Sequence, residues 1–364
     1  MNASIAVRRL HNQFVARPRR LAPAELVRWL GAVQAQEYQP AKWGLALRLG
    51  SANGDAAIER AITDGHILRT HVMRPTWHFV ARDDLHWMLE LTAPRVHKTM
   101  SVYNRHQGLE KADIVRAVGI FERSLSGGDH LTRAELGERL AHAGYRVSSL
   151  QLSLLTMYAE LEAVVCSGPR RGKQFTYGLL SERAPDPRRL ERDEALGELS
   201  RRFFTSHGPA TIRDFVWWSG LTTADARRGL EIIRARSESS DGITYWSAAQ
   251  VRVAAERRPV HLLPIYDEYL VAYRDRVAVP HGPGSFGSGL ESITFQHAVI
   301  SKGQIVGTWR TRTTGDGVAV GIFPLNALTA AERRGLEEEA ARYGRFLGAE
   351  VAVTFAGGKG RGSK

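Results

Sequence analysis

Two glutamines separated by a single alanine, Gln34 and Gln36, are the residues whose type and spacing could place two reactive groups at one point. In an extended segment, residues two apart point to the same side, so both amides would face one spot. Each amide offers an acceptor oxygen and two N–H donors and carries no formal charge. Such a pair could hold a water molecule, a sugar or a phosphate. The spacing alone is more typical of ordinary polar residues near a helix end, so it does not establish a site.

A short amphipathic helix leads into this pair. The apolar residues Leu26, Trp29, Leu30 and Val33 recur at helical spacing and predict one buried stripe. The pattern then becomes polar, and Pro40 disfavours helical angles at the residue before it. We therefore expect both glutamines to lie at or just beyond the end of this helix.

The composition is that of an ordinary globular protein of two or three domains, with 364 residues, 43% of them hydrophobic and 24% charged. Cys166 is the only cysteine, so no disulfide or cysteine-based zinc site can form within the chain, which fits a reducing cytosol. We find no apolar run of membrane-spanning length and no secretory hydrophobic core at the N-terminus. These features predict a cytoplasmic protein with no membrane-spanning segment.

The charge balance is strongly basic. The formal net charge is +12, from 50 lysines and arginines against 38 acidic residues. A surplus of this size favours a polyanionic partner, and arginine suits bidentate contacts with phosphates and base edges. We expect nucleic acid and not a membrane as the partner, although the charge alone would also suit a membrane surface, an acidic protein or no partner. A GC-rich genome would also raise the arginine content.

Other candidate chemistry is weaker. Motifs for phosphate loops, dinucleotide binding, metalloproteases and serine hydrolases are absent from the sequence. His66, His71 and His78 lie close together but lack a carboxylate or cysteine partner at ligand spacing, so we expect structural histidines, no metal and no cofactor. Asp267 and Glu268 are adjacent and would point to different sides, which favours a capping or structural role over a catalytic carboxylate pair.

The expected elements repeat three times as helices followed by a β-hairpin, which is the order of a winged helix. The clearest case has the spacing of a capping box at Thr132 and Glu135, a helix at 148–161 and a hairpin at 164–180. The apolar first strand of this hairpin holds Cys166 in a packed position, and the tip could otherwise be an ordinary solvated turn. In the third repeat, a strand pair is expected around a turn at Asp241 and Gly242. A β-rich region follows, with strands expected at 260–264 and 269–273 and a mobile glycine-rich loop at 281–289. We place the units at 1–103, 104–183 and 184–258, the β-rich region at 259–356 and a disordered basic tail at 357–364.

These segments resemble the winged-helix DNA glycosylases of the AlkZ/YcaQ family over about residues 5–356. The resemblance rests on the stretches at 31–36, 68–78, 263–270 and 303–309. The catalytic motif of that family is glutamine, an apolar residue, then glutamine or aspartate. Gln34, Ala35 and Gln36 match the two-glutamine, AlkZ-like branch. One departure is Pro75, which follows Arg74 where the family pattern leads us to expect glycine, and which stiffens the turn.

The resemblance implies an α+β fold of three tandem winged-helix units in a C-shaped arrangement, with a basic concave surface and a C-terminal β-barrel-like region. It implies a monofunctional DNA glycosylase that hydrolyses the N-glycosidic bond of N7-alkylated guanine in double-stranded DNA. Its substrates would include bulky adducts or interstrand crosslinks from genotoxic natural products, and its role would be self-resistance. We expect a cytoplasmic, nucleoid-associated monomer without a cofactor.

Two amides suit this chemistry. Alkylation at N7 gives the base a positive charge and makes it a good leaving group, so no general acid is needed, in contrast to ordinary glycosidases. We expect Gln36 to orient the attacking water and Gln34 to support the water and the sugar. Glu37 could instead deprotonate the water, but we expect it to point the other way.

Three hairpins carry the residues that we expect to contact DNA. They are Arg69 and Arg74 in the first, Arg170, Arg171 and Lys173 in the second, and Arg310, Arg312 and Thr313 in the third. The main alternative function is a non-catalytic winged-helix transcription regulator, which would need a sequence-reading helix and usually dimer symmetry. A further alternative is a general glycosylase for small N7-methyl lesions, which shares the mechanism but not the substrate.

Overall fold

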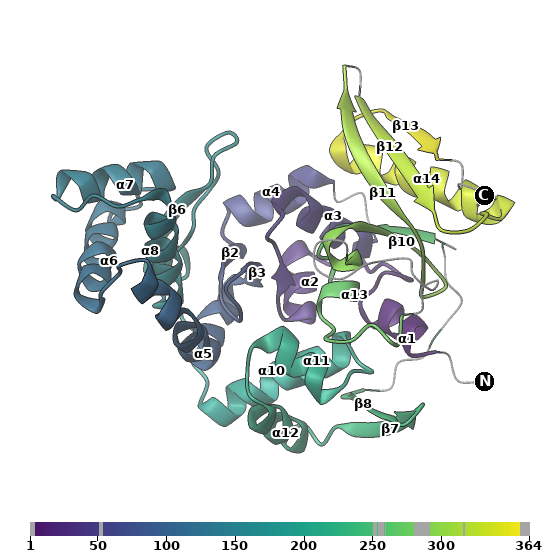
Figure 1. The fold of residues 1–364 in the computed structure, drawn as a ribbon, viewed down its shortest axis with the longest axis horizontal. Coiled ribbons are helices and arrows are strands. Elements are labelled where there is room, and N and C mark those ends of the chain that lie inside the picture. Colours follow the sequence, from purple (N-terminus) through teal and green to yellow (C-terminus); the bar gives the residue numbers. More distant parts are fainter. Residues whose placement is uncertain are drawn as a thin grey trace, which may run out of the picture.

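The computed structural model describes residues 4–50, 54–249, 253, 258, 260–279, 292–315 and 317–356, and these form a mixed α+β structure (Figure 1). The mobile loop predicted at 281–289 and the disordered tail predicted at 357–364 lie outside the described residues. Within the described ranges, no helix is both long enough and apolar enough to cross a membrane.

The first part of the chain builds a three-stranded sheet with helices around it. Its elements are α1 (Ile5–Asn12), α2 (Pro23–Leu30), β1 (Val33–Gln34), α3 (Tyr38–Arg48), α4 (Asp55–Thr63), β2 (Ile67–His71) and β3 (Trp77–Ala81). The strands pair antiparallel in the order β1-β3-β2, and the hairpin predicted around Arg74 is confirmed. Pro40, which we expected to keep Gln39 out of a helix, lies in the first turn of α3. A helical N–H has no partner there, so proline costs nothing.

The second part repeats this order after the 3₁₀ turn η1 (Arg82–Asp84) and the long helix α5 (Leu85–His106). Its elements are α6 (Lys111–Leu125), β4 (Leu131–Thr132), α7 (Arg133–His142), α8 (Ser149–Leu161), β5 (Val165–Ser167), β6 (Thr176–Leu179) and α9 (Leu180–Arg183). The strand order, β4-β6-β5, matches the first sheet. The predicted capping box of Thr132 and Glu135 is confirmed. Cys166 lies buried in β5, as predicted, and burial raises its pKa to about 12.

The third part has the same order with a shorter sheet. Its elements are α10 (Arg192–Ser206), α11 (Ile212–Ser219), α12 (Thr223–Ile232), β7 (Arg236–Ser240) and β8 (Ile243–Ser247). A single bridge between Ala210 and Trp246 stands where the other two parts have their first strand. The turn predicted at Asp241 and Gly242 is confirmed, because both residues have positive φ angles and join β7 to β8.

The C-terminal region is an open sheet. Its elements are β9 (Val260–Leu263), α13 (Glu268–Val271), η3 (Ile293–Phe295), β10 (His297–Ser301), β11 (Gln304–Thr314), β12 (Gly317–Pro324), α14 (Ala330–Leu347) and β13 (Val351–Phe355). The strand order β13-β12-β11-β10-β9 leaves two edges, so the described strands do not close into the expected barrel-like form. The strand expected at 269–273 is also wrong, because Asp267 caps a short helix there, α13, by accepting from the N–H of Tyr269.

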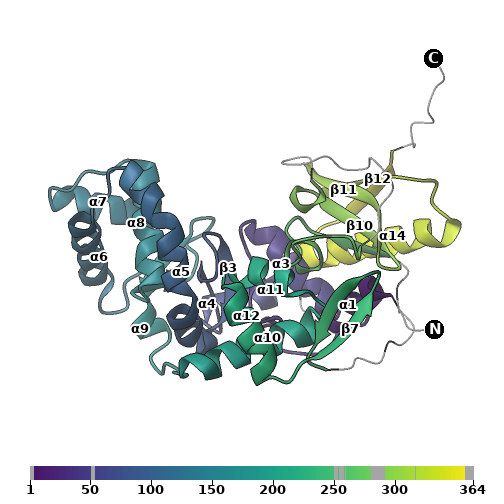
Figure 2. The same cartoon turned by 60° about the horizontal axis from the view of Figure 1, so that its bottom comes forward.

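Two hydrophobic cores meet at the glutamine segment. Ala32 packs in a core shared by α5, the second part and the third part, whereas Val33 and Ala35 pack in a core shared with the C-terminal sheet. The first part therefore joins the two halves of the molecule. Figure 2 shows the second part and the C-terminal sheet as two arms on either side of it.

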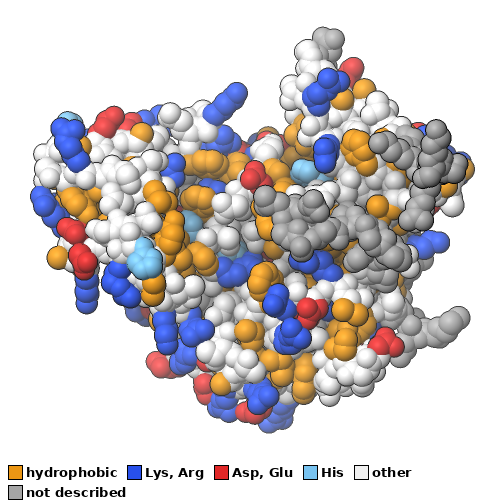
Figure 3. All heavy atoms as spheres, in the orientation of Figure 1, with side chains coloured by type: hydrophobic (Ala, Val, Ile, Leu, Met, Phe, Trp, Pro, Cys, Tyr) orange, Lys and Arg blue, Asp and Glu red, His pale blue; other side chains and the backbone are white. Residues whose placement is uncertain are grey.

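The surface is hollowed between these two arms (Figure 3). The hairpin β5–β6 projects from one arm and the hairpin β11–β12 from the other (Figure 1). Lysine or arginine side chains lie on both projections (Figure 3). The two predicted basic hairpins thus border one notch although about 140 residues separate them in the sequence.

Candidate active site

The two glutamines follow α2 on a segment that joins the first sheet. Gly31 ends α2 with a φ of +84°, and a Cβ at this position would lie 3.0 Å from the Trp218 ring. Glycine is therefore required both by the backbone and by the packing. Beyond it, Gln34 pairs with His78 across β1 and β3, and the Ala35 N–H donates to the carbonyl of Trp77 at 2.7 Å. The glutamines lie just past a helix end, as the sequence predicts.

Gln34 is held through both its backbone and its side chain. Its N–H donates to Oε1 of Glu268 at 2.7 Å, and its Oε1 accepts from Nη2 of Arg74 at 2.8 Å. The side chain is almost buried, with 6% of its surface exposed. Gln36 is partly exposed and makes no hydrogen bond to any described residue. One amide is therefore anchored and the other is free.

Glu268 is a buried carboxylate that the sequence did not link to the glutamines. Its Oε2 lies 3.1 Å from the indole nitrogen of Trp218 and 3.3 Å from Nε2 of His207. Burial opposes ionisation, but the bonds from His207 and from the Gln34 N–H, with the charge of Arg74, hold the pKa of Glu268 below its usual value. Burial lowers the pKa of His207, although the hydrogen bond and the charge of Glu268 oppose that shift.

Asp267 faces a different partner, as predicted for adjacent acids. It forms a paired contact with the guanidinium of Arg48, with both N–O distances at 2.8 Å. Both side chains are almost fully buried. Arg48 lies on α3 and also donates to Gln13 at 2.9 Å. This pair holds the segment before α13 against α3, and so fixes the position from which Glu268 reaches Gln34.

Arg69 is buried against the segment that holds Gln34 and Gln36 and does not lie on the surface. Its Nε donates to the carbonyl of Ala35 at 3.0 Å, and only 8% of the residue is exposed. Its guanidinium lies 4.4 Å from the ring centroid of Trp77 and 4.6 Å from that of Phe175. The structure therefore brings Arg69 and Arg74, both predicted as DNA contacts, to the two sides of the glutamine segment.

The hairpin β5–β6 leans toward the same segment. Arg170 lies 5.0 Å from the ring centroid of Tyr38, which is two residues after Gln36. Arg171 turns back to its own unit, where it donates to Glu135 and to the carbonyl of His130, each at 2.7 Å. Lys173 is exposed. Of these three predicted DNA contacts, the structure brings only Arg170 near the motif.

The third hairpin lies apart from the glutamines. Arg310, Arg312 and Thr313 are all exposed on β11, close to its turn with β12. The Arg310 guanidinium lies 5.7 Å from the ring centroid of Phe323 on the neighbouring strand. No described carboxylate pairs with Arg310 or Arg312, so their charges are available to a ligand.

Two of the three histidines in the predicted hairpin region are tied into the interior. His71 contacts the carboxylate of Glu160 on α8 and so joins the first two parts of the chain. His78 is completely buried, and burial, together with the charge of Arg74, lowers its pKa to about 3. Within the described ranges, no group of three or more potential ligands could hold a metal ion.

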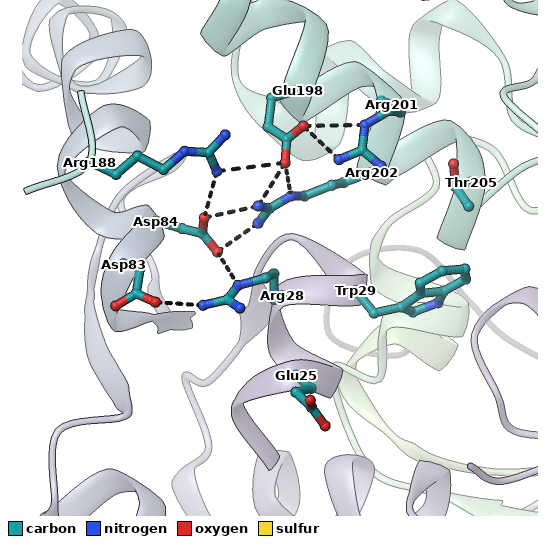
Figure 4. Close-up of a pocket in the computed structure, with 10 residues that line it drawn as sticks. All are labelled: Glu25, Arg28, Trp29, Asp83, Asp84, Arg188, Glu198, Arg201, Arg202 and Thr205. Atoms are coloured by element: carbon teal, nitrogen blue, oxygen red, sulfur yellow. Dashed lines mark hydrogen bonds and ion pairs between the residues drawn. The ribbon is translucent and has the colours of Figure 1, made fainter. Parts of the chain in front are cut away.

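A cavity of about 520 Å³ lies elsewhere, between α2, η1 and α10 (Figure 4). It is lined by an ion-pair network in which Arg202 donates to both oxygens of Asp84, at 2.7 and 2.9 Å. Arg28 pairs with Asp83 at 2.7 Å on the other side. Because its charges satisfy one another, the network joins three elements and does not form a second reactive site. The cavity beside Gln34 measures only about 10 Å³.

Comparisons with known proteins show that this chain is similar to DNA glycosylases. The family model described as DNA glycosylase AlkZ-like matches residues 27–346. A relative named interstrand DNA cross-link repair glycosylase, from Streptomyces sahachiroi, is 25% identical over 322 residues, which cover 83% of this chain and 85% of that protein. The solved structure of Streptomyces sahachiroi DNA glycosylase AlkZ aligns with a TM-score of 0.79 and 22% identity. That alignment covers 98% of this chain and 100% of the other.

Proposed function

Since this chain belongs to the DNA glycosylase AlkZ-like family, we propose that it hydrolyses the N-glycosidic bond of N7-alkylated guanine in double-stranded DNA. Family membership makes it a DNA repair glycosylase and decides against the non-catalytic regulator. The observation that carries the proposal is the placement of Gln34 and Gln36 at the end of β1, where Arg74 and Glu268 hold the first of them.

The proposed reaction needs water but no general acid. The water oxygen forms a bond to C1′ of the sugar while the bond from C1′ to the base breaks. The bonding electron pair moves to the base and neutralises the charge that alkylation placed on it, and the water loses its proton to solvent. Glu268 supports this scheme because it is buried, accepts three hydrogen bonds and has a lowered pKa, so it is not an acid at neutral pH.

We further propose that the three repeated parts are winged-helix units in a C-shaped arrangement. The shared order of helices and strands supports this, as do the equivalent strand orders of the first two sheets. The units would span 1–103, 104–183 and 184–258, followed by the β-rich region at 259–356. We propose that the protein acts on DNA as a monomer.

The proposed DNA path lies in the notch between the two arms. The exposed Arg310, Arg312 and Thr313 would bind on one side, and Lys173 with Arg171 on the other. Arg69, Arg74 and Arg170 are closer to the motif and would act on the glutamine segment.

Bulky adducts or interstrand crosslinks are the substrates that we favour. The relative from Streptomyces sahachiroi is named for crosslink repair, which supports this choice. The cavity beside Gln34, at about 10 Å³, is no larger than one water molecule requires, so a large adduct would bind outside this cavity. A role in resistance to a genotoxic natural product would follow if such adducts are the better substrates.

Single-turnover excision tests the proposal. A duplex with one N7-methylguanine is incubated with wild type and with the Gln34→Ala/Gln36→Ala variant, and strand cleavage at abasic sites is measured. We expect wild type to excise the base, and the variant to be at least about 1,000-fold slower while its DNA affinity stays within about threefold. Wild-type binding without excision on this lesion, on a bulky adduct and on a crosslink would refute the proposal.

A further inference from the structure

The orientation of the Gln34 amide follows from its neighbour in the turn between β2 and β3. Nη2 of Arg74 lies 2.8 Å from the side-chain oxygen of Gln34. A guanidinium has five N–H donors and no acceptor, so the atom that faces Arg74 must be the amide oxygen. The two amide N–H donors of Gln34 then point elsewhere, and no described residue accepts from them.

Arg74 is committed to this contact. Among the described residues, Gln34 is the only hydrogen-bond acceptor of its guanidinium, and its Nε is buried without a partner. The turn itself is tight, since the Thr76 N–H donates to the carbonyl of Arg74 at 2.7 Å. The ring centroid of Trp217 lies 6.0 Å from the guanidinium and limits its movement on one side. The side chain is thus held against Gln34.

The backbone of Gln34 is held from the opposite direction. Its N–H donates to Glu268, a carboxylate that Trp218 and His207 fix in turn. With the backbone and the amide oxygen both bound, rotation of the amide would break the bond to Arg74. Gln36 has no such restraint, so both its oxygen and its nitrogen can meet a ligand.

We propose that Arg74 is a positioning residue that fixes Gln34 as a hydrogen-bond donor. Gln34 then gives its N–H donors to an oxygen of the DNA backbone at the lesion. The acceptor role, holding the attacking water, falls to Gln36. This inference rests on the proposed glycosylase function, and it changes the role of Arg74 from a DNA contact to a support of Gln34.

The two roles of Arg74 predict different losses. An arginine that binds a phosphate contributes to DNA affinity, and its removal lowers the salt slope of binding by about 1. An arginine that acts through Gln34 contributes to the rate of the bound complex. Its effect must also disappear once the Gln34 amide has been removed.

A double-mutant cycle distinguishes the two possible roles of Arg74. Single-turnover excision of N7-methylguanine at saturating enzyme is measured for Arg74→Met, Gln34→Ala and the double variant. We expect Arg74→Met to be about 10- to 100-fold slower, with DNA affinity within about twofold and an unchanged salt slope. The double variant should be no slower than Gln34→Ala, and Arg74→Lys, which retains a donor, should recover part of the rate. Arg189→Met serves as the control, because that arginine is exposed and, among the described residues, pairs only with Glu90, at 3.0 Å.

The matched variants Gln34→Glu and Gln36→Glu test which glutamine donates hydrogen bonds and which accepts them. A carboxylate accepts hydrogen bonds but cannot donate them at neutral pH. Gln34→Glu should therefore be as slow as Gln34→Ala, whereas Gln36→Glu should be faster than Gln36→Ala. Thermal unfolding of each variant identifies any loss that comes from misfolding.

The outcomes are distinguishable. Full additivity of Arg74→Met and Gln34→Ala, or a lower salt slope at an unchanged rate, would overturn the positioning role. The reverse ranking of the glutamate variants would overturn the donor role of Gln34. Wild type that excises no lesion would instead refute the glycosylase proposal on which the inference rests.

Discussion

Two hairpins of this glycosylase carry arginines of similar appearance in opposite surroundings. In β2–β3, Arg69 is buried and Arg74 partly buried, and each donates a hydrogen bond to the glutamine segment. In β11–β12, Arg310 and Arg312 are exposed and no described carboxylate pairs with them. Both hairpins contribute positive charge, but only the arginines of the first lie in or close to the interior.

This difference teaches that burial decides what an arginine can do. A buried guanidinium has lost its water and acts through fixed hydrogen bonds, so its removal leaves an unsatisfied partner and a gap. An exposed guanidinium keeps its water and acts through screened charge, so its removal changes affinity and salt dependence. The three predictions below test this contrast.

The largest effect is expected from Arg69→Met. The substitution removes a charge-assisted bond to the Ala35 carbonyl and two contacts with aromatic rings, of Trp77 and Phe175. We expect a loss of about 3 kcal/mol in the free energy of unfolding and about 100-fold in single-turnover excision. Urea unfolding and excision at saturating enzyme measure the two losses. A variant with wild-type stability and only weaker DNA binding would place Arg69 with the exposed arginines instead.

An intermediate effect is expected from pH. His78, on β3 beside Gln34 of β1, is fully buried with a pKa of about 3, well below the unfolded value. Below pH about 6.5, His78 takes up a proton in the unfolded chain but not in the folded protein. Stability therefore falls as the pH falls, and this group lowers it by about 2 kcal/mol at pH 5. Urea unfolding at pH 7 and at pH 5 measures the loss in the free energy of unfolding between the two values. His78→Leu should reduce that loss by the contribution of His78, about 2 kcal/mol.

The matched control for this pH test is Arg312→Ala, because Arg312 is exposed and no described carboxylate pairs with it. It should show the same loss of stability between pH 7 and pH 5 as wild type. If His78→Leu also shows the full wild-type loss, the buried histidine does not contribute to the pH dependence.

The smallest effect is expected from Arg312→Ala on DNA binding. Because Arg312 is exposed, its removal should leave stability within about 0.5 kcal/mol and lower the salt slope of binding by about 1. Excision at saturating enzyme should stay at the wild-type rate. A salt titration of DNA affinity measures the slope. A change of excision rate without a change of slope would mean that Arg312 acts on the reaction, as we expect of the arginines in β2–β3, and not on DNA binding.

Most local elements could be predicted because their signals lie within a few residues. The capping box at Thr132, the turn at Asp241 and the buried strand around Cys166 all occur as expected. Two expectations for the C-terminal region fail, one for a local reason and one for a non-local reason. A short helix, α13, replaces a strand because one capping side chain, Asp267, outweighs the apolar pattern that follows it. The open form of the C-terminal sheet could not be predicted, because the order of the strands is not encoded in any single strand.

The features of the candidate site also divide into those that the sequence predicts and those that only the structure identifies. The sequence by itself determined which residues form the glutamine motif, the helix that precedes them and the basic character of three hairpins. Only the tertiary structure decided that Glu268, 234 positions from Gln34, accepts its N–H, and that Arg74 holds its amide oxygen. The reason is physical: helix caps and turns depend on neighbours along the chain, whereas the partner of a buried polar group depends on which distant surfaces the hydrophobic cores bring together.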